Sequence, residues 1–221
     1  PDWRVQLASD SNPDVRRVVA RNPNTPPQTL THLSTDTDVL VRRDVASNHH
    51  TPPETLTQLS TSSDRITRRR VSMNHNASPE ILAHLANDRD NDIRYKVALN
   101  SNTSPEILTR MSTDNQAIVR QTVARNVNTP HEALIHLSND RETDVRKNVA
   151  ENHNTPPEVL VRLSTDVMFI VRLCIASSRH TPSEILTRMS TDVNRLIRRR
   201  ICTNPNTPLE VVDRTEKLEV M

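Results

Sequence analysis

One arginine recurs at the same place in every copy of a repeated sequence pattern. The row consists of Arg16, Arg42, Arg68, Arg94, Arg120, Arg146, Arg172 and Arg198. Six residues earlier stands an acidic row, with Ser62 at the one place that breaks it: Asp10, Asp36, Asp88, Asp114, Asp140, Asp166 and Asp192. A row of guanidinium groups could bind anions. Each guanidinium could instead bridge a carboxylate or helix-end carbonyl groups in its own or the next repeat, because its donors have a fixed geometry. Since Arg and Asp recur together, we favour this structural ladder.

Cysteines and histidines are the next candidates for chemistry. The histidines that share a repeat position form two sets, His49, His75 and His153, and His32, His84 and His136. Packed helices lie roughly 8–10 Å apart, so His32 and His84, two repeats apart, cannot share a metal with bonds of about 2 Å. His49 and His75 are in adjacent repeats but have no third ligand. We therefore predict no metal site and no cofactor in this segment.

Nothing in the chain has the spacing of a catalytic site. No Ser/His/Asp or Cys/His arrangement can be placed together from the sequence, and a glycine-rich phosphate loop is impossible because the chain has no glycine. The expectation is that the protein is not an enzyme.

The elements that must position these residues come from a repeat of constant length. A proline or its substitute marks the period, at Pro27, Pro53, Pro79, Pro105, His131, Pro157, Ser183 and Leu209. Each step is 26 residues, without insertion or deletion. A period of this size is typical of solenoids and repeat arrays.

Each repeat predicts two short helices. The first follows a capping box such as Thr25-Pro26-Pro27-Gln28 and buries a leucine pair such as Leu30 and Leu33. The second follows an aspartate such as Asp36, which we expect to cap it, and buries residues such as Val41 and Val45. An asparagine ends most second helices, and in a chain without glycine we expect it to adopt the left-handed conformation there. The row is Asn22, Asn48, Asn74, Asn100, Asn126, Asn152 and Asn204, with Ser178 as the exception.

The outward positions of the second helices vary from repeat to repeat, as a binding surface on a regular scaffold does. The candidate partner-binding residues are Met168, Phe169, Leu173, Tyr95, Arg65, Arg69, Arg195 and Arg199. Phe169 and Leu173 would lie one turn apart, facing away from the core, and form a contact site for a partner protein or for self-association. The alternative is that local curvature tucks them under the next repeat.

Composition restricts the class further. The chain has 221 residues, only three aromatic residues and a net charge of +2, so the charge gives no strong case for nucleic acid. No apolar run reaches the length of a membrane helix, and two cysteines without Cys-x-x-Cys spacing indicate a reducing, cytoplasmic location. We predict one solenoid domain over residues 1–212, of about eight repeats with the first and last incomplete, and a polar tail or cap over 213–221.

The repeated phrase, for example Asn152-His153-Asn154-Thr155-Pro156-Pro157-Glu158 and the Val-Arg-x-x-Val-Ala that follows, resembles the leucine-rich repeat variant family. Its second half is also similar to HEAT repeats. The resemblance implies an all-α, right-handed superhelical solenoid of alternating α and 3₁₀ helices without a β-sheet. The family's best-known member carries an iron–sulfur cluster in a cysteine-rich segment ahead of its repeats. Cys174 and Cys202 cannot supply four cluster ligands, so the cluster is not carried over to this segment.

The leading functional hypothesis is a non-enzymatic scaffold that binds a protein through the outer face of its second helices. The alternative is a nucleic-acid-binding solenoid that uses two arginine clusters, Arg65, Arg68, Arg69 and Arg70, and Arg195, Arg198, Arg199 and Arg200. No aromatic residues are spaced for base stacking, which counts against the alternative.

Overall fold

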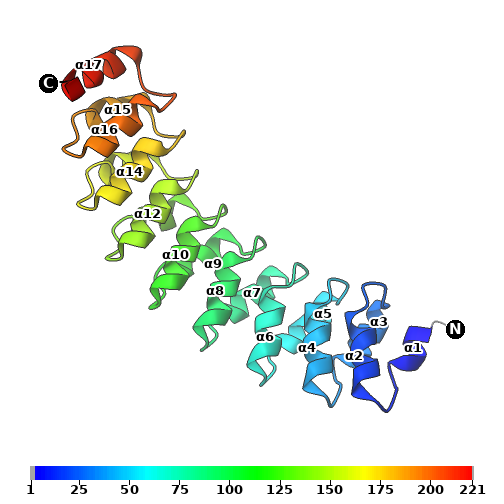
Figure 1. Ribbon diagram of the computed structural model, residues 1–221. Helices are drawn as coiled ribbons and strands as arrows, with labels where there is room; N and C mark the ends of the chain where they lie inside the picture. Colours follow the sequence, from blue (N-terminus) through cyan, green and yellow to red (C-terminus); the bar gives the residue numbers. More distant parts are fainter. Residues whose placement is uncertain (1–2, 221) are drawn as a thin grey trace. The chain divides into compact units, whose positions relative to one another are not determined.

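The computed structural model describes residues 3–220, and this part of the chain is built from α-helices without a β-strand (Figure 1). A short helix, α1 (Trp3–Leu7), comes first. The first helices of the repeats are α3 (Pro27–Leu33), α5 (Pro53–Ser60), α7 (Pro79–Leu85), α9 (Pro105–Met111), α11 (His131–Leu137), α13 (Pro157–Leu163), α15 (Ser183–Met189) and α17 (Leu209–Val220). The second helices are α2 (Pro13–Arg21), α4 (Val39–Ser47), α6 (Arg65–Ser72), α8 (Asn91–Leu99), α10 (Ala117–Arg125), α12 (Thr143–Glu151), α14 (Phe169–Ser177) and α16 (Arg195–Cys202). The predicted all-α repeat fold is confirmed.

The expected alternation of α and 3₁₀ helices is wrong for residues 3–220, where both helices of each repeat are α. In α3, the Leu30 N–H donates to the Pro26 carbonyl, and the Ser34 N–H donates to the Leu30 carbonyl at 2.9 Å. These are i→i−4 bonds, and the i→i−3 bonds from Thr29 to Pro26 and from Ser34 to Thr31 lie beside them at the two ends of the helix. Even a helix of two turns therefore keeps the α pattern, with tightening confined to its ends.

The chain forms two compact units, residues 1–107 and 108–221, where the sequence predicts one domain over 1–212. In the first unit α2, α4, α6 and α8 pack in sequence, each against the next, as the blue to green ribbons of Figure 1 show. In the second unit α10, α12, α14 and α16 do the same, and α17 packs against α16. The predicted tail over 213–221 is thus helical as far as residue 220.

The core of each unit consists of the predicted small and branched apolar residues. Leu30 and Leu33 of α3 are fully buried, and so are Val41, Val45 and Ala46 of α4. Each helix is too short to be stable alone, so its stability comes from burying these faces against the neighbouring repeat. None of the described helices is both long and apolar enough to cross a membrane.

The predicted capping box is wrong, because the threonine caps nothing. Thr25 is buried, and its hydroxyl donates to the Val19 carbonyl at the end of α2, at 2.6 Å. The residue at the start of α3 is Pro26, which offers no side-chain bond. The threonine thus adds a second bond to a helix-end carbonyl of α2, which also accepts the N–H of Asn22. The same bond recurs at Thr51, Thr103, Thr129, Thr155, Thr181 and Thr207.

The prediction of left-handed asparagines is also wrong, since no described residue has a positive φ. Asn48 has φ −73° and ψ 127°, which is extended backbone. Its side-chain amide donates to the carbonyls of Ala20 and Asn22 in the preceding repeat, at 2.8 and 3.0 Å. Its Oδ1 accepts the N–H of His50. The asparagine is therefore a connection between repeats, a role that no local pattern reveals.

Asp36 does not cap α4 as predicted. The cap is Asp38, whose Oδ1 accepts the N–H of Leu40 at 2.6 Å. Asp36 lies two residues earlier, where its Oδ1 accepts the N–H of Asp38 in a tight turn. The turn leaves the Asp36 carboxylate aimed at the preceding repeat.

Candidate protein-binding surface

The arginine row and the aspartate row meet between repeats. The Nε and Nη2 groups of Arg120 donate to the two carboxylate oxygens of Asp140, at 2.5 and 3.0 Å. The Nη1 group donates to the carbonyl of Asp114, in the turn before α10, at 2.7 Å. Only 9% and 8% of the two side chains is exposed. The same fork joins Arg16 to Asp36, Arg68 to Asp88, Arg146 to Asp166 and Arg172 to Asp192.

The forks keep these carboxylates charged. The hydrogen bond from Arg16 lowers the pKa of Asp36 below its usual range, against the opposing effect of burial. At Asp140 burial raises the pKa, but the hydrogen bonds from Arg120 and from the Glu142 N–H outweigh it, so the pKa is lowered overall. Ionised pairs of this kind, buried and fully hydrogen-bonded, hold adjacent repeats in one geometry. We refer to them as the arginine ladder.

Three further arginines of the row also donate to turn carbonyls. Arg94 and Arg198 donate through Nη1 to the carbonyls of Asp88 and Asp192. Arg42 donates through Nη1 to the carbonyls of Asp36 and Thr37, as the other arginines do in their own repeats. The next repeat offers Arg42 the hydroxyl of Ser62 in place of a carboxylate.

The first arginine cluster of the nucleic-acid alternative is engaged by carboxylates. Arg65 contacts Asp90 and Arg69 contacts Asp92, each at 2.5 Å. Arg68 is in the ladder, and Arg70 contacts Asp44 at 2.9 Å. Of the outward arginines, Arg65 remains well exposed while Arg69 is half-buried; Arg195 and Arg199 are exposed.

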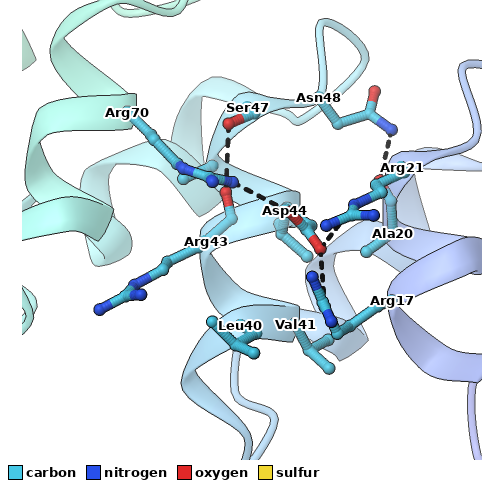
Figure 2. Close-up of polar contacts among 12 residues, drawn as sticks. Arg17, Ala20, Arg21, Leu40, Val41, Arg43, Asp44, Ser47, Asn48 and Arg70 are labelled. Atoms are coloured by element: carbon cyan, nitrogen blue, oxygen red, sulfur yellow. Dashed lines mark hydrogen bonds and ion pairs between the residues drawn. The ribbon is translucent and has the colours of Figure 1, made fainter. Parts of the chain in front are cut away.

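A buried carboxylate that sequence reasoning missed lies at the centre of three arginines (Figure 2). The Asp44 side chain is only 5% exposed. Its Oδ2 accepts from the Nε groups of Arg17 and Arg21, at 3.2 and 2.9 Å, and its Oδ1 accepts from Arg70. These arginines come from α2 and α6, on either side of α4. The signal in the sequence was that Asp44 is the only acidic residue at its repeat position: the others are Val18, Arg70, Lys96, Thr122, Asn148, Cys174 and Arg200.

The predicted apolar contact site divides into two parts. Phe169 is 44% exposed at the start of α14, and Met168 before it is also exposed. Leu173 is half-buried, so Phe169 lies on the surface whereas Leu173 turns toward α12. Tyr95 is half-buried as well, with the Lys96 ammonium 4.8 Å from its ring centre.

Leu173 lines a groove of about 420 Å³ along α12 and α14. Ile170 and Leu173 give its apolar wall, while Lys147, Glu151 and His180 bring polar groups to it. We call it the α12–α14 groove. Such a mixture of apolar wall and few polar groups is typical of ligand sites.

Cys174, also in the α12–α14 groove, is a poor nucleophile. Its thiol donates to the Glu151 carboxylate at 3.3 Å. Burial and this carboxylate raise the pKa of Cys174 to about 12, so the thiol stays protonated at neutral pH. The groove is therefore suited to binding and not to thiol chemistry.

In the described part of the chain two pairs of histidines meet, His49 with His75 at one repeat position and His153 with His180 at two successive positions. The rings of His49 and His75 stack with centres 5.7 Å apart, and those of His153 and His180 meet edge to face at 4.2 Å. Within residues 3–220 no group of three or more His, Cys, Asp or Glu side chains is arranged to hold a metal ion.

Exposed apolar residues extend from Phe169 along the turns before α14 and α16. Val167 is 86% exposed and Val193, at the same position of the next repeat, is 91% exposed; both line one hollow. Leu196 of α16 is exposed too. We call Val167, Met168, Phe169, Val193 and Leu196 the apolar edge. Of these residues the sequence analysis predicted only Met168 and Phe169. The equivalents of Val167 in other repeats are polar, such as Thr37 and Arg89, so the apolar residue at this position could have been recognised from the sequence.

Comparison with known proteins identifies one matching family. The model described as "Leucine rich repeat variant" matches residues 13–38 and 143–168, each one 26-residue period. A solved structure described as a leucine-rich repeat variant with a novel repetitive structural motif is similar at 30% identity and a TM-score of 0.70, over 91% of this chain and 80% of that chain.

Other solved structures are more distant. An engineered protein is 17% identical with a TM-score of 0.45, over 98% of this chain and 82% of that chain. A computationally designed armadillo repeat protein for modular peptide recognition is 14% identical with a TM-score of 0.27, over 99% and 98%. No curated protein sequence matches the chain.

Proposed function

Because the chain belongs to the leucine-rich repeat variant family, we propose that it is a non-enzymatic repeat scaffold which binds a protein partner through the outer face of its second helices. The α12–α14 groove and the apolar edge are the part of that face that contacts the partner. The exposed Phe169 is the observation that carries the proposal. Burial of Phe169 by a partner would contribute about 1.5–3 kcal/mol from transfer alone.

The groove supports a protein as the occupant, since it combines an apolar wall with charges of both signs. Ile170 and Leu173 would take an apolar side chain, while Lys147 and Glu151 offer one partner each for an acidic and a basic side chain. Central apolar contacts surrounded by polar groups are how protein interfaces are organised. We propose no cofactor for this part of the protein. Cytoplasmic location is part of the proposal too, supported by Cys174 and Cys202, neither of which forms a disulfide.

The nucleic-acid alternative has less support. The arginines of α6 are already bonded to carboxylates, so binding phosphate would require them to exchange one anion for another. Titration with duplex and single-stranded DNA at low and high salt separates the two functions, because phosphate binding must weaken steeply with salt.

The test is the substitution Phe169→Glu, with Ala117→Glu as its matched control at the equivalent position of α10. Purified protein would be crosslinked in an extract of its source cells and the captured proteins quantified by mass spectrometry. Phe169→Glu should abolish capture of the specific partner, while Ala117→Glu retains it and both variants keep their helicity by circular dichroism. Equal capture by the two variants would contradict the proposed surface. Sedimentation at increasing concentration shows whether the partner is a second copy of the chain.

A further inference from the structure

The row of arginines is interrupted at Arg42, where Ser62 stands in place of the ladder aspartate. Elsewhere in the ladder an arginine places its Nε and Nη2 groups against the carboxylate found 20 residues later, as in Arg16 and Asp36 or Arg68 and Asp88. The residue 20 positions after Arg42 is Ser62. Arg42 uses its Nη1 group on two carbonyls, and within residues 3–220 its Nε and Nη2 groups contact no carboxylate.

Ser62 keeps the backbone of the aspartate that it replaces. Its hydroxyl oxygen accepts the N–H of Asp64 at 3.2 Å, which is the bond that Asp36 makes to the N–H of Asp38. The turn therefore presents a neutral hydroxyl at the place where the other turns present an anion. Helix α4 packs against α6, as α2 packs against α4.

The charges around this place favour an anion. A ladder aspartate lies between the arginine of the preceding repeat and that of its own repeat, as Asp36 lies between Arg16 and Arg42. Ser62 lies between Arg42 and Arg68 in the same way, because the Arg68 Nη1 group donates to the Ser62 carbonyl at 2.8 Å. Arg68 is neutralised by Asp88, and the nearby Asp64 is bonded to Arg43. Arg42 acts on Asp36 only through its charge, because the Asp36 carboxylate is bonded to Arg16 and Arg42 itself is bonded to backbone carbonyls.

Ser62 can also be reached from solvent. Together with Ser63 it lines an open hollow of about 500 Å³ on the side of Arg68 and Asp88. Ser62 is half-buried and Ser63 is exposed, so an anion can enter from solvent.

We propose that Arg42 and Ser62 form a binding site for one phosphate group, held by the Nε and Nη2 groups of Arg42 and by the hydroxyl of Ser62. A planar guanidinium fork is well suited to two phosphate oxygens. The bound phosphate completes the ladder between α4 and α6. It is supplied as free phosphate or as a phosphate ester carried by another molecule, and both present the same dianionic oxygens to the fork.

The direct test is NMR of the arginine Nε–H groups, with the Arg42 signal assigned by its loss in Arg42→Lys. Inorganic phosphate should shift this signal saturably, and chloride at the same ionic strength should not. A phosphomonoester such as phosphoethanolamine, titrated in parallel, distinguishes the two sources: an equal shift means that the ester also fits, and a shift with inorganic phosphate alone restricts the site to the free ion. No saturable shift with either compound overturns the proposal.

Thermal unfolding gives an independent test with matched variants. In about 50 mM phosphate the Tm of the unmodified chain should exceed that in chloride by about 2 °C. Ser62→Asp supplies the missing carboxylate, so it should raise the Tm in chloride and remove the additional gain from phosphate. Ser63→Asp adds the same charge one residue away and should do neither. If Ser63→Asp behaves as Ser62→Asp does, general electrostatics explains the effect and the site does not exist.

Discussion

At the scale of single residues, the ladder arginines are the charged side chains whose removal should destabilise the fold most. Arg120 is bonded to both oxygens of a nearly buried carboxylate and to a turn carbonyl. Removing it leaves Asp140 charged with the Glu142 N–H as its remaining donor, which is more costly than losing a surface pair. Arg120→Ala should therefore lower the free energy of unfolding by about 2–3 kcal/mol, measured by urea denaturation.

Arg42→Ala is the control for this prediction. It removes the same side chain from the same repeat position, but Arg42 has only carbonyl partners. The loss should be smaller, on the order of 1 kcal/mol. Equal losses at the two positions would mean that the carbonyl bonds, and not the carboxylates, carry the contribution of the ladder.

At the scale of the helix, α14 begins without a side-chain cap. Met168 occupies the cap position with φ −87° and ψ 116°, close to the backbone of Asp38 before α4. Met168→Asp should accept the free N–H groups of the first turn and raise stability by about 1 kcal/mol, or about 2–4 °C in Tm. Met168→Ala, which provides no acceptor, should show no gain by differential scanning calorimetry.

The asparagine that joins each repeat to the one before gives a second prediction for an element. Asn204 donates to the carbonyls of Ala176 and Ser178, but Ser178 takes the asparagine position at the end of α14. Its backbone already has the same extended conformation. Ser178→Asn should therefore add an inter-repeat bond and slow hydrogen exchange of the α14 amides. An unchanged exchange rate would show that the asparagine bonds are not limiting for local opening.

Predictability from the sequence also varies with the element. The period, the helix positions and the buried faces follow from spacing, because helices of this length must bury one face. The threonine and asparagine roles did not follow, since Thr25 and Asn48 match local capping motifs yet bond to carbonyls of an earlier helix. On the candidate surface Phe169 was found from its unusual type at an outward position, whereas Val193 and Leu196 were missed because each belongs to a different repeat from Phe169.

At the scale of the whole molecule, the ladder makes stability depend on acid. At Asp166 and Asp192 burial raises the pKa, but the bonds from Arg146 and Arg172 lower it overall. An aspartate in the unfolded chain has a pKa of about 3.9, so the unfolded state binds protons first as the pH falls. Stability should be level above about pH 5 and decrease below about pH 4, as followed by circular dichroism in urea at each pH. A loss that begins above pH 6 would indicate histidines instead.

The constant offset between ladder partners makes the repeats interchangeable. Ladder arginines such as Arg120 reach a carboxylate 20 residues later, and inter-repeat asparagines such as Asn48 reach carbonyls 26 and 28 residues earlier. A duplicated block of one period therefore contains the donors and acceptors that bond to the repeat on either side of it. Such a chain can lengthen by gene duplication without inventing a new junction, while an insertion of any other length breaks every connection at that boundary. An unbroken period is the expected result of such duplications. The outward side chains can change without affecting the bonds between repeats.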